Sequence, residues 1–401
     1  MSDYVLVINA GSSSLKYSLV DAGSGEALAE GLIERIGESE GHQQHRGPDG
    51  ETESSDALAT HEDALRAALD AFAKHGPSLD DLELAAVGHR VVHGGAKFAV
   101  PSLIDDALVA EVTDLVPLAP LHNPANLEGI EVARRLFPDL PQVAVFDTAF
   151  HQTLPPHAYT YAVPSEWLDD HGIRRYGFHG TSHSFVSEQA AHRLGRDLAD
   201  LNLIVLHLGN GCSAAAVQGG ESVETSMGMT PLEGLVMGTR SGDLDPAVHG
   251  HLVREAGWSV DEIDNALNKK SGLKGLAGEN DFRALAKLRA AGDPKAELAF
   301  DVYCHRIKKY VGAYYAVLGT VDAIVFTAGV GQHSADVRAA VLHGLERLGI
   351  RLDPVRNADP AEDGLVSTDD SEVAVLVIPT NEEWQIARQA LELVTKEETA
   401  S

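Results

Sequence analysis

The sequence predicts an α/β fold made of two similar halves that face a cleft, because one strand-turn-strand pattern occurs twice in the chain. The first copy spans residues 5–20 and the second spans residues 203–217. Each copy begins with an apolar run, passes through a turn that contains glycine, and returns as a second strand. Apolar residues also recur at helical spacing in four segments, 61–75, 126–137, 183–195 and 295–318.

The first hairpin has the composition of a phosphate-binding loop. The apolar run 5–8 predicts a strand buried on both faces, and Gly11 permits a tight turn. Ser12 and Ser14 offer hydroxyl groups and Lys16 offers a cation, so the loop can hold a phosphoryl oxygen without a helix N-terminus. An ordinary serine-rich hairpin is the alternative interpretation.

A third strand, beginning at Asp322, runs into Gly329-Val-Gly331, where a backbone can pass close to a nucleotide. Residues 334–348 are expected to form the helix that follows. The dinucleotide motif Gly-x-Gly-x-x-Gly is not completed, because Ser334 occupies its last position, and no Walker loop occurs. A bound nucleotide is therefore not expected to be held in the Rossmann or P-loop manner.

Length and charge limit the class of protein. The 401 residues, 44% of them apolar, are enough for two domains with separate cores. The net charge of −29 argues against nucleic acid or an anionic membrane as partner. The opening Met-Ser-Asp-Tyr has no basic region before an apolar core, and no later run has the length of a membrane span. A cytoplasmic location is expected.

Cysteine and histidine usage gives little support to a metal centre. Cys212 and Cys304 are far apart, so neither a disulfide framework nor a cysteine zinc site is expected, and both are predicted to be buried fillers. The acidic segment 37–56 contains His42 and His45. A solvated loop or edge hairpin is the favoured interpretation there, and a metal site is the alternative.

Two charged residues stand at the ends of predicted strands. Arg90 lies between apolar residues just before a Gly-Gly turn, so it is expected to face an anion, with an ion pair to a structural carboxylate as the alternative. Asp147 follows the apolar run from Val143 and is placed to ligate a metal or orient a substrate at a sheet edge. A helix cap is an equally common use of such an aspartate.

Two further candidates lie in the second half of the chain. Arg240 belongs to a Gly-rich segment, residues 219–245, whose length is typical of a functional loop. His179 and His183 are four residues apart, but Gly180 stands where the metalloprotease motif has its glutamate. A zinc site at these histidines is therefore not favoured.

Several of these motifs together resemble the acetate kinase family, of the acetate and sugar kinase/actin superfamily. The resemblance covers essentially the whole chain, and the segments that carry it are residues 9–16, 89–95, 120–124, 146–151, 176–183, 207–211, 237–243 and 379–383. It implies two ribonuclease-H-like (actin-like) α/β domains facing a central nucleotide cleft. Residues 1–150 with a returning helix in 382–401 would bind acid and phosphate, and residues 151–381 would bind nucleotide and form a homodimer.

The resemblance implies reversible, Mg²⁺-dependent transfer of the ATP γ-phosphoryl group to acetate, with Mn²⁺ as an alternative ion. Arg90 and Arg240 would stabilise the charge of a loose transition state, and His179 would hydrogen-bond the phosphoryl group in flight. Acetate is already ionised at pH 7, so no general base is needed. Asp147 is therefore interpreted as orienting Arg90 or the hydrated metal.

The remaining site residues are also carried over by resemblance. The metal would be held by Asn9 and Glu382. The acid would be held by Arg90, Val92, Leu121, His122, Phe178 and Pro231. ATP or ADP would be held by Ser12, Ser14, Lys16, His207, Leu208, Gly209, Asn210, Gly211, Asp281, Phe282, Arg283, Gly329, Val330, Gly331, Gln332 and His333. At one point the chain departs from the family, because Gln332-His333 replaces the usual Glu-Asn and removes an acidic group.

Two other functions remain as alternatives. A propionate or butyrate kinase would share the chemistry, and the volume of the pocket at Val92 and Phe178 would decide between the acids, since one methylene is worth only about 1–3 kcal/mol there. A non-catalytic actin-like ATP-binding module is the other alternative. The joint presence of Arg90, Arg240 and His179 argues against it, because an ATP clamp has no need to bind a second anion.

Overall fold

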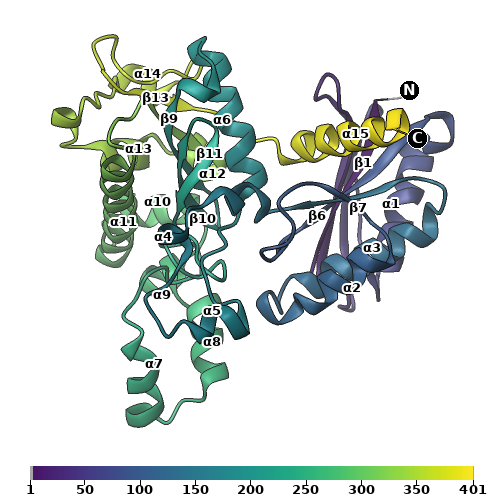
Figure 1. The fold of residues 1–401 in the computed structure, drawn as a ribbon, viewed down its shortest axis with the longest axis horizontal. Helices are drawn as coiled ribbons and strands as arrows, with labels where there is room; N and C mark the ends of the chain where they lie inside the picture. The colour runs from purple at the N-terminus through teal and green to yellow at the C-terminus, as the bar shows by residue number, and fades with distance from the viewer. Residues whose placement is uncertain (1–2, 401) are drawn as a thin grey trace. The chain divides into compact units, whose positions relative to one another are not determined.

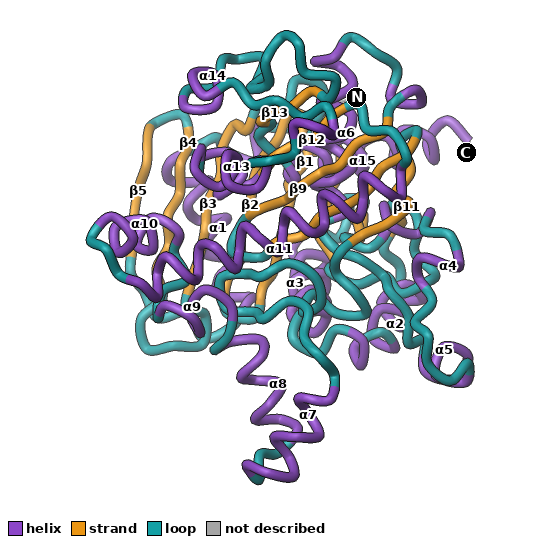
Figure 2. The backbone as a smooth tube through the Cα atoms, turned by 90° about the vertical axis from the view of Figure 1, so that its left-hand side faces the viewer, coloured by secondary structure: helices purple, strands orange, loops and turns teal. Residues whose placement is uncertain are grey.

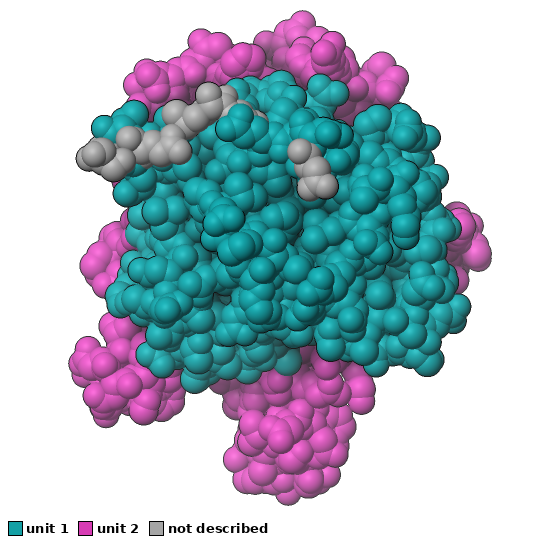
Figure 3. All heavy atoms as spheres, turned by 90° about the vertical axis from the view of Figure 1, so that its right-hand side faces the viewer, with its two compact units in different colours: residues 1–150, 381–401 teal, residues 151–380 magenta. Residues whose placement is uncertain are grey.

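The computed structural model describes residues 3–400, which fall into two compact units (Figure 3). Unit 1 contains the chain up to Phe150 and the chain from Asn381 onward, and unit 2 is His151–Thr380. No helix in the described range is long and apolar enough to cross a membrane.

Unit 1 is built on a mixed sheet with the strand order β5-β4-β3-β2-β1-β6-β8-β7. Its strands are β1 (Tyr4–Gly11), β2 (Ser14–Asp21), β3 (Ala27–Glu34), β4 (His42–Gly47), β5 (Gly50–Ser54), β6 (Leu84–Val91), β7 (Ser102–Leu103) and β8 (Gln142–Phe146). Its helices are α1 (His61–His75), α2 (Asp106–Asp114), α3 (Asn123–Leu136) and α15 (Glu382–Ala400).

Helices cover both faces of this sheet, which is why β1 reads as a continuous apolar run (Figure 1). Leu6 and Ile8 point to the face covered by α1 and α3, where Phe72 is part of the core. Val5 and Val7 point to the opposite face and pack against α15. The last helix of the chain therefore completes the core that the first strand begins.

Unit 2 is built on a five-stranded sheet with the order β11-β10-β9-β12-β13. Its strands are β9 (Asn202–Leu208), β10 (Cys212–Gln218), β11 (Glu221–Thr225), β12 (Ala323–Thr327) and β13 (Ala374–Val377). Its helices are α4 (Pro156–Tyr159), α5 (Glu166–His171), α6 (Gly180–Leu194), α7 (Ala247–His251), α8 (Val260–Lys269), α9 (Gly272–Ala277), α10 (Phe282–Ala290), α11 (Pro294–Leu318), α12 (Ala328–His333), α13 (Ala335–Leu342) and α14 (Pro354–Ala358). Within this unit, α7 and α8 extend away from the sheet as a helical projection (Figure 2).

The two sheets share one arrangement of five strands. In unit 1, β1 pairs antiparallel with β2 and parallel with β6, and β6 pairs parallel with β8. In unit 2, β9 pairs antiparallel with β10 and parallel with β12, and β12 pairs parallel with β13. The third strand of each set, β3 or β11, pairs antiparallel with the second. The predicted α/β fold with two similar halves is confirmed by this repeat.

Some expected element boundaries were wrong. The single helix expected over 334–348 ends at Leu342, and only a short 3-10 turn, Glu346–Leu348, follows it. Gly344 interrupts the segment with a φ of 77°, a conformation that glycine adopts without strain. The Gly329-Val-Gly331 segment, into which the third strand was expected to run, lies inside the short helix α12.

Both ring nitrogens of His45, in segment 37–56, are used for contacts within the protein. The segment forms the edge hairpin β4–β5, as the favoured interpretation expected. His45 uses Nδ1 for the Tyr17 hydroxyl at 2.9 Å and Nε2 for the Gly76 carbonyl at 3.3 Å. Cys212 and Cys304 are free and buried, as predicted.

Candidate active site

The first phosphate hairpin lies at the tip of β1 and β2 in unit 1. Gly11 is paired with Ser14, so Ser12 and Ser13 form the turn and both are exposed. A Cβ at Gly11 would come within 2.7 Å of Ser14 Oγ, so a larger residue there would have to displace the Ser14 hydroxyl. His61 Nε2 contacts the Gly11 carbonyl at 2.7 Å and fixes the loop from α1. The turn thus presents two hydroxyl groups on a rigid support.

Arg90 and Asp147 meet at the carboxyl edge of the parallel strands β6 and β8. Arg90 Nε lies 3.0 Å from Asp147 Oδ1, and Nη2 lies 2.5 Å from Oδ2, so the pair is bidentate. The Asp147 side chain is only 1% exposed and the Arg90 side chain 20% exposed. Asp147 is thus not a helix cap. It holds Arg90 in one orientation with part of the guanidinium open to solvent.

Burial and neighbouring charges shift the pKa values of both members of this pair. Burial acts to lower the pKa of Arg90, but the negative charges of Asp147 and Glu382 outweigh burial and hold that pKa above its ordinary value. Burial raises the pKa of the Asp147 carboxyl, and the Arg90 charge opposes that shift. Arg90 therefore remains a cation at any pH where the protein is folded.

The predicted metal ligands fit a hard divalent ion. Glu382 Oε1 is buried and makes no hydrogen bond to any described residue. Asn9 Oδ1 lies 3.5 Å from Arg90 Nη1, at the edge of the same cluster. Mg²⁺ is commonly held by one or two protein oxygens together with waters and phosphate oxygens. Within residues 3–400 no group of three His, Cys, Asp or Glu side chains converges to hold a metal, at this place or at any other.

Lys16 is not isolated, because its Nζ is paired with the Glu383 carboxylate. Glu383 follows Glu382 at the start of α15, so one helix end carries both the predicted metal ligand and the partner of the lysine. The Glu383 partner was not predicted from the sequence. The feature of the sequence that could have indicated Glu383 is its position directly after Glu382.

Two asparagines that the sequence analysis missed support the segment after β6. Asn126 accepts from the Val92 N–H at 2.9 Å and donates to the Ala10 carbonyl at 2.7 Å. Asn123 accepts from the His93 N–H at 3.2 Å and donates to the His93 carbonyl at 3.1 Å. Both asparagines are buried in the first turn of α3, and this i, i+3 polar pair inside an apolar helix face was the signal.

The residues expected to hold the acid divide between the units. In unit 1, Val92 is buried, Leu121 is 49% exposed, and His122 lies close enough to Asp147 to act on the pKa of its carboxyl. In unit 2, Phe178 is buried and the Pro231 carbonyl accepts from Arg240 Nη1 at 2.6 Å.

In unit 2, the loop 209–211, which the resemblance implies binds phosphate and which we call the second phosphate loop, brings Arg240 and His179 together. A Cβ added to Gly211 would lie 2.6 Å from Arg240 Nη2 and 3.4 Å from His179 Nε2. The loop is tied to the Gly-rich segment, because the Gly238 N–H donates to the Asn210 carbonyl at 2.9 Å. Arg240 and His179 therefore flank the backbone that is expected to bind phosphate.

Arg240 differs from Arg90 in its partners. No carboxylate among the described residues lies within ion-pair distance of Arg240, and burial lowers the pKa of its guanidinium. A partly buried guanidinium without an anion favours binding of an anionic ligand. A structural ion pair, the alternative use of such an arginine, is not made here.

A cavity of about 510 Å³ lies within unit 2 beside the second phosphate loop. Its lining includes these predicted nucleotide residues: Gly209, Asn210, Asp281, Phe282, Arg283, Gly329, Val330 and His333. Asn280 and Ser334 line it as well and were not predicted. Gly329 has open space at its Cβ position, which leaves room for a ligand beside the backbone.

Five of the predicted nucleotide residues in unit 2 do not line this cavity: His207, Leu208, Gly211, Gly331 and Gln332. Leu208 is fully buried in β9, and the Gln332 carbonyl accepts from the buried Arg338 at 2.8 Å.

Asp281 caps α10 by accepting from Arg283 N at 2.8 Å. The hydrogen bonds from Arg283 and Ala284 hold the pKa of Asp281 at about 2.

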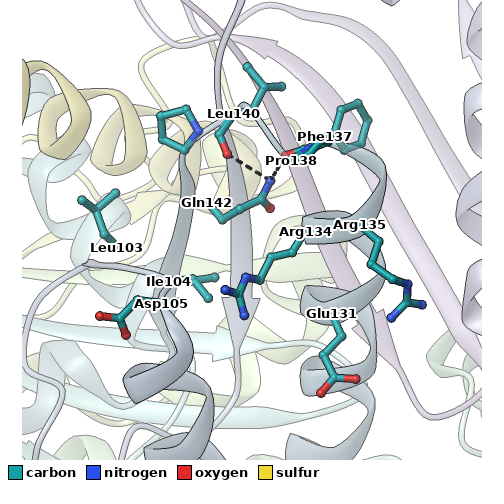
Figure 4. Close-up of a pocket in the computed structure, with 11 residues that line it drawn as sticks. Leu103, Ile104, Asp105, Glu131, Arg134, Arg135, Phe137, Pro138, Leu140 and Gln142 are labelled. Atoms are coloured by element: carbon teal, nitrogen blue, oxygen red, sulfur yellow. Dashed lines mark hydrogen bonds between the residues drawn. The ribbon is translucent and has the colours of Figure 1, made fainter.

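A larger cavity in unit 1, of about 740 Å³, contains no predicted site residue. It lies at the C-terminal end of α3, where Gln142 donates to the carbonyls of Phe137 and Leu140 (Figure 4). Its two arginines are already paired, Arg134 with Asp106 and Arg135 with Glu62. Neither is therefore comparable to Arg240.

The repeated α/β arrangement, with a Gly-containing hairpin in each unit, places the protein in the actin-like fold class expected from the sequence. The chain belongs to the acetokinase family, whose model matches residues 4–388. It is 59% identical to the acetate kinase of Leifsonia xyli subsp. xyli over 97% of this chain and 98% of that protein.

Solved structures of the family have the same fold. The acetate kinase of Porphyromonas gingivalis and a propionate kinase of Francisella tularensis subsp. tularensis each superpose with a TM-score of 0.92. Each is 42% identical and covers 97% of this chain and 99% of its own. The family and the fold class expected from the sequence are thereby confirmed, and the principal functional prediction agrees with the relatives' names.

Proposed function

We propose that this protein catalyses reversible transfer of the γ-phosphoryl group of ATP to acetate, giving acetyl phosphate and ADP. The observation that carries the proposal is the arginine at position 240, which has no carboxylate partner and lies with His179 against the phosphate loop. An actin-like module that only binds ATP has no use for a further cation at this point.

The proposed roles follow from the chemistry of phosphoryl transfer. The transferring group passes through a loose transition state whose charge lies on its equatorial oxygens, so fixed cations lower the barrier. We assign this stabilisation to Arg90 and Arg240, and we assign to His179 a hydrogen bond to the same oxygens. Arg90 also binds the acetate carboxylate, which needs no base because it is already ionised.

Asp147 acts through Arg90. Its bidentate bond leaves the guanidinium in one orientation, so the cation reaches the transition state without reorganising.

Asn9 and Glu382 are proposed to hold Mg²⁺, or Mn²⁺ in its place. A bound divalent ion neutralises charge on the phosphate oxygens of ATP.

ATP is proposed to bind in the unit 2 cavity, with the adenosine near Phe282, Gly329 and His333. The phosphates would extend to the loop 209–211 and to the hairpin hydroxyls of Ser12 and Ser14. Lys16 would exchange its Glu383 partner for a phosphate oxygen, which its exposure allows. Gln332 stands where the family usually has glutamate, so an acidic contact to the base or ribose is not expected.

The direct test is formation of acyl phosphate. Purified protein is incubated with ATP, Mg²⁺ and acetate, and acetyl phosphate is trapped with hydroxylamine. Robust hydroxamate formation supports the proposal, and ATP hydrolysis without hydroxamate contradicts it. The Arg134→Ala variant, altered in the unrelated unit 1 cavity, serves as a control that should keep full activity.

A second candidate is a preference for propionate. It is favoured by one observation, since the propionate kinase of Francisella tularensis matches this chain with the same identity and TM-score as an acetate kinase. Measuring kcat/KM for acetate, propionate and butyrate distinguishes a preference for acetate from a preference for propionate. We expect acetate to exceed propionate by roughly 10-fold or more, as for one methylene in a small apolar pocket.

A homodimer in the cytoplasm is the proposed state of the protein. The α7–α8 projection exposes Val253 at 44%, Trp258 at 40% and Val260 at 70%, an apolar set that a second copy could cover. Light scattering after size-exclusion chromatography tests this, and a monomer at micromolar concentration would contradict it.

A further inference from the structure

A buried serine connects the two histidines of the His179-x-x-x-His183 motif. Ser213, on β10, places its Oγ 2.9 Å from His179 Nδ1 and 2.7 Å from His183 Nε2. His179 precedes the first residue of α6 and His183 lies in the first turn, so the i, i+4 spacing puts both rings on one side of the helix. Ser213 and His183 are each 0% exposed.

The hydroxyl can donate only one proton, which limits the arrangements of the three groups. In the first arrangement, His183 Nε2–H donates to Ser213, and the Ser213 hydroxyl donates to His179 Nδ1. In the second, the direction is reversed, so that His179 Nδ1–H donates to Ser213 and Ser213 donates to His183 Nε2. If both rings donated, the serine hydrogen would need a further acceptor, and no described residue supplies one.

The other nitrogen of His183 distinguishes the two directions. His183 Nδ1 is buried and has no hydrogen-bond partner among residues 3–400. The reversed direction would place a proton on that atom and leave a buried N–H donor unsatisfied, which is rare and costly in folded proteins. In the first direction, His183 Nδ1 carries no hydrogen, so only a nitrogen lone pair is left without a partner. Burial also holds the pKa of His183 well below 6.5, with His151 and His207 acting the same way, so the ring stays neutral.

We propose that Ser213, oriented by His183, is a positioning residue that holds His179 in the tautomer with its proton on Nε2. That atom lies beside Gly211 and Arg240, on the side of the ring that faces the phosphate loop. An Nε2–H donates to an anionic phosphoryl oxygen, whereas the other tautomer would present a lone pair and repel it. The inference rests on the proposed function only for the consequence in catalysis, because the tautomer itself is a property of unit 2.

The tautomer is measured directly by two-bond ¹H–¹⁵N correlation NMR on protein labelled at histidine, with the His179 signals identified from a His179→Asn variant. We expect the wild-type His179 ring at pH 7 to carry its proton on Nε2. A proton on Nδ1 would overturn the proposal, whatever the activity of the protein proves to be. A Ser213→Ala variant should show loss of the single-tautomer signature.

Kinetics give the second readout. Ser213→Ala should lower kcat by roughly 10- to 100-fold, somewhat less than loss of a complete oxyanion donor, with the KM for ATP changed by less than about threefold. His183→Gln keeps an N–H donor and should retain most of kcat. The matched control is Ser222→Ala, because Ser222 is equally buried and bonds His151 Nδ1 at 2.7 Å without touching His179.

The outcomes separate this inference from the proposed function. Equal losses of kcat in Ser213→Ala and Ser222→Ala would show a general structural effect and overturn the positioning role. Absence of acetyl phosphate with the wild-type protein would refute the proposed function, while the NMR measurement would still decide the tautomer. If Ser213→Ala does not fold, the wild-type spectrum and the His183→Gln variant remain decisive.

Discussion

At the scale of single residues, the two central arginines are prepared differently. Arg90 is fixed by a bidentate carboxylate, and Arg240 is held by the Pro231 carbonyl with no anion beside it. The first is oriented in advance and the second retains an unneutralised charge. This difference allows separate predictions for the two residues.

Replacing Arg240 with alanine is expected to lower kcat by on the order of 10³, because arginines that stabilise phosphoryl transfer contribute about this much. The KM for ATP should change by less than about fivefold, because the adenosine cavity has its own lining. Steady-state kinetics at saturating acetate measure both parameters. Arg134→Ala is the matched control, and an unchanged kcat in Arg240→Ala would refute the assigned role.

Replacing Asp147 with asparagine removes one half of the bidentate bond and the charge behind Arg90. We expect kcat to fall by roughly 10²- to 10³-fold, comparable to loss of a preorganised electrostatic group. The shape of the pH–rate profile should stay the same, because Asp147 acts through Arg90 and moves no proton. Disappearance of a limb of the profile in Asp147→Asn would instead identify Asp147 as a proton donor or acceptor. A thermal unfolding curve verifies that the variant is folded.

Residue identities could be predicted from the sequence where a motif was long, but their contacts could not. Arg90 and Asp147 were both expected at strand ends, yet their bidentate bond depends on β6 and β8 being neighbours in the sheet. Ser213 had no signal of its own, because a serine inside an apolar strand is normally a small filler. Only the folded hairpin brings it between His179 and His183.

At the scale of elements, α15 carries one of the two proposed metal ligands, Glu382, near the end of the chain. Its N-terminal turn carries Glu382 and Glu383, and its apolar side packs through Ile386 and Ala390 on the sheet of unit 1. Gly88 makes this close approach possible, since a Cβ there would lie 2.8 Å from Ile386 Cγ2. Packing of the helix therefore determines where the carboxylates stand.

Truncating Ile386 to alanine is expected to lower the free energy of unfolding by about 2–4 kcal/mol, because the side chain is 2% exposed and its loss leaves a cavity. Val355→Ala, at a residue that is 78% exposed, is the control and should change stability by less than about 0.5 kcal/mol. Urea unfolding followed by circular dichroism measures both variants. Equal stability of the two would contradict the packing role of α15.

The strands and long helices were predicted well because their apolar periodicity is strong. The helix expected over 295–318 is α11, Pro294–Leu318, and the one expected over 61–75 is α1. The region after Gly331 was predicted poorly. There α12, α13 and a 3-10 turn follow one another with breaks at Ser334 and Gly344, and sequence periodicity alone does not mark such short elements.

At the scale of the whole molecule, buried histidines link stability to pH. Burial lowers the pKa of His89 and of His151 to about 4, and it lowers that of His183 well below 6.5. Below pH 6.5 the unfolded chain binds protons at these rings while the folded chain does not. Stability is therefore full above pH 6.5 and is lost as the pH falls toward 4.

Each of these histidines should remove about 1.4 kcal/mol of unfolding free energy per pH unit once the pH is well below 6.5. Urea unfolding between pH 7 and pH 5 measures the slope, above the range where most carboxylates titrate. His89→Gln should reduce the slope by the contribution of one group, whereas the exposed His157→Gln keeps all three buried rings and should not. A slope unaffected by His89→Gln would show that this ring is not neutral and buried in the folded state.

Both units have the same strand order, and this repeat is what the two similar hairpins in the sequence predict. The two Gly-containing hairpins are 200 residues apart in the chain, yet each leads into the same sheet arrangement, with parallel partners β6 or β12. The proposed reaction uses one hairpin and one arginine from each repeat. The central claim is therefore that a single phosphoryl group passes directly from ATP to acetate under the action of residues from both.

The most direct test of that claim is to make acetyl phosphate from acetate and ATP whose γ-phosphorus is chiral through oxygen isotopes, and to determine the configuration of the product. One direct in-line transfer predicts inversion at phosphorus. Retention would require a phosphorylated protein side chain as an intermediate and would contradict the account.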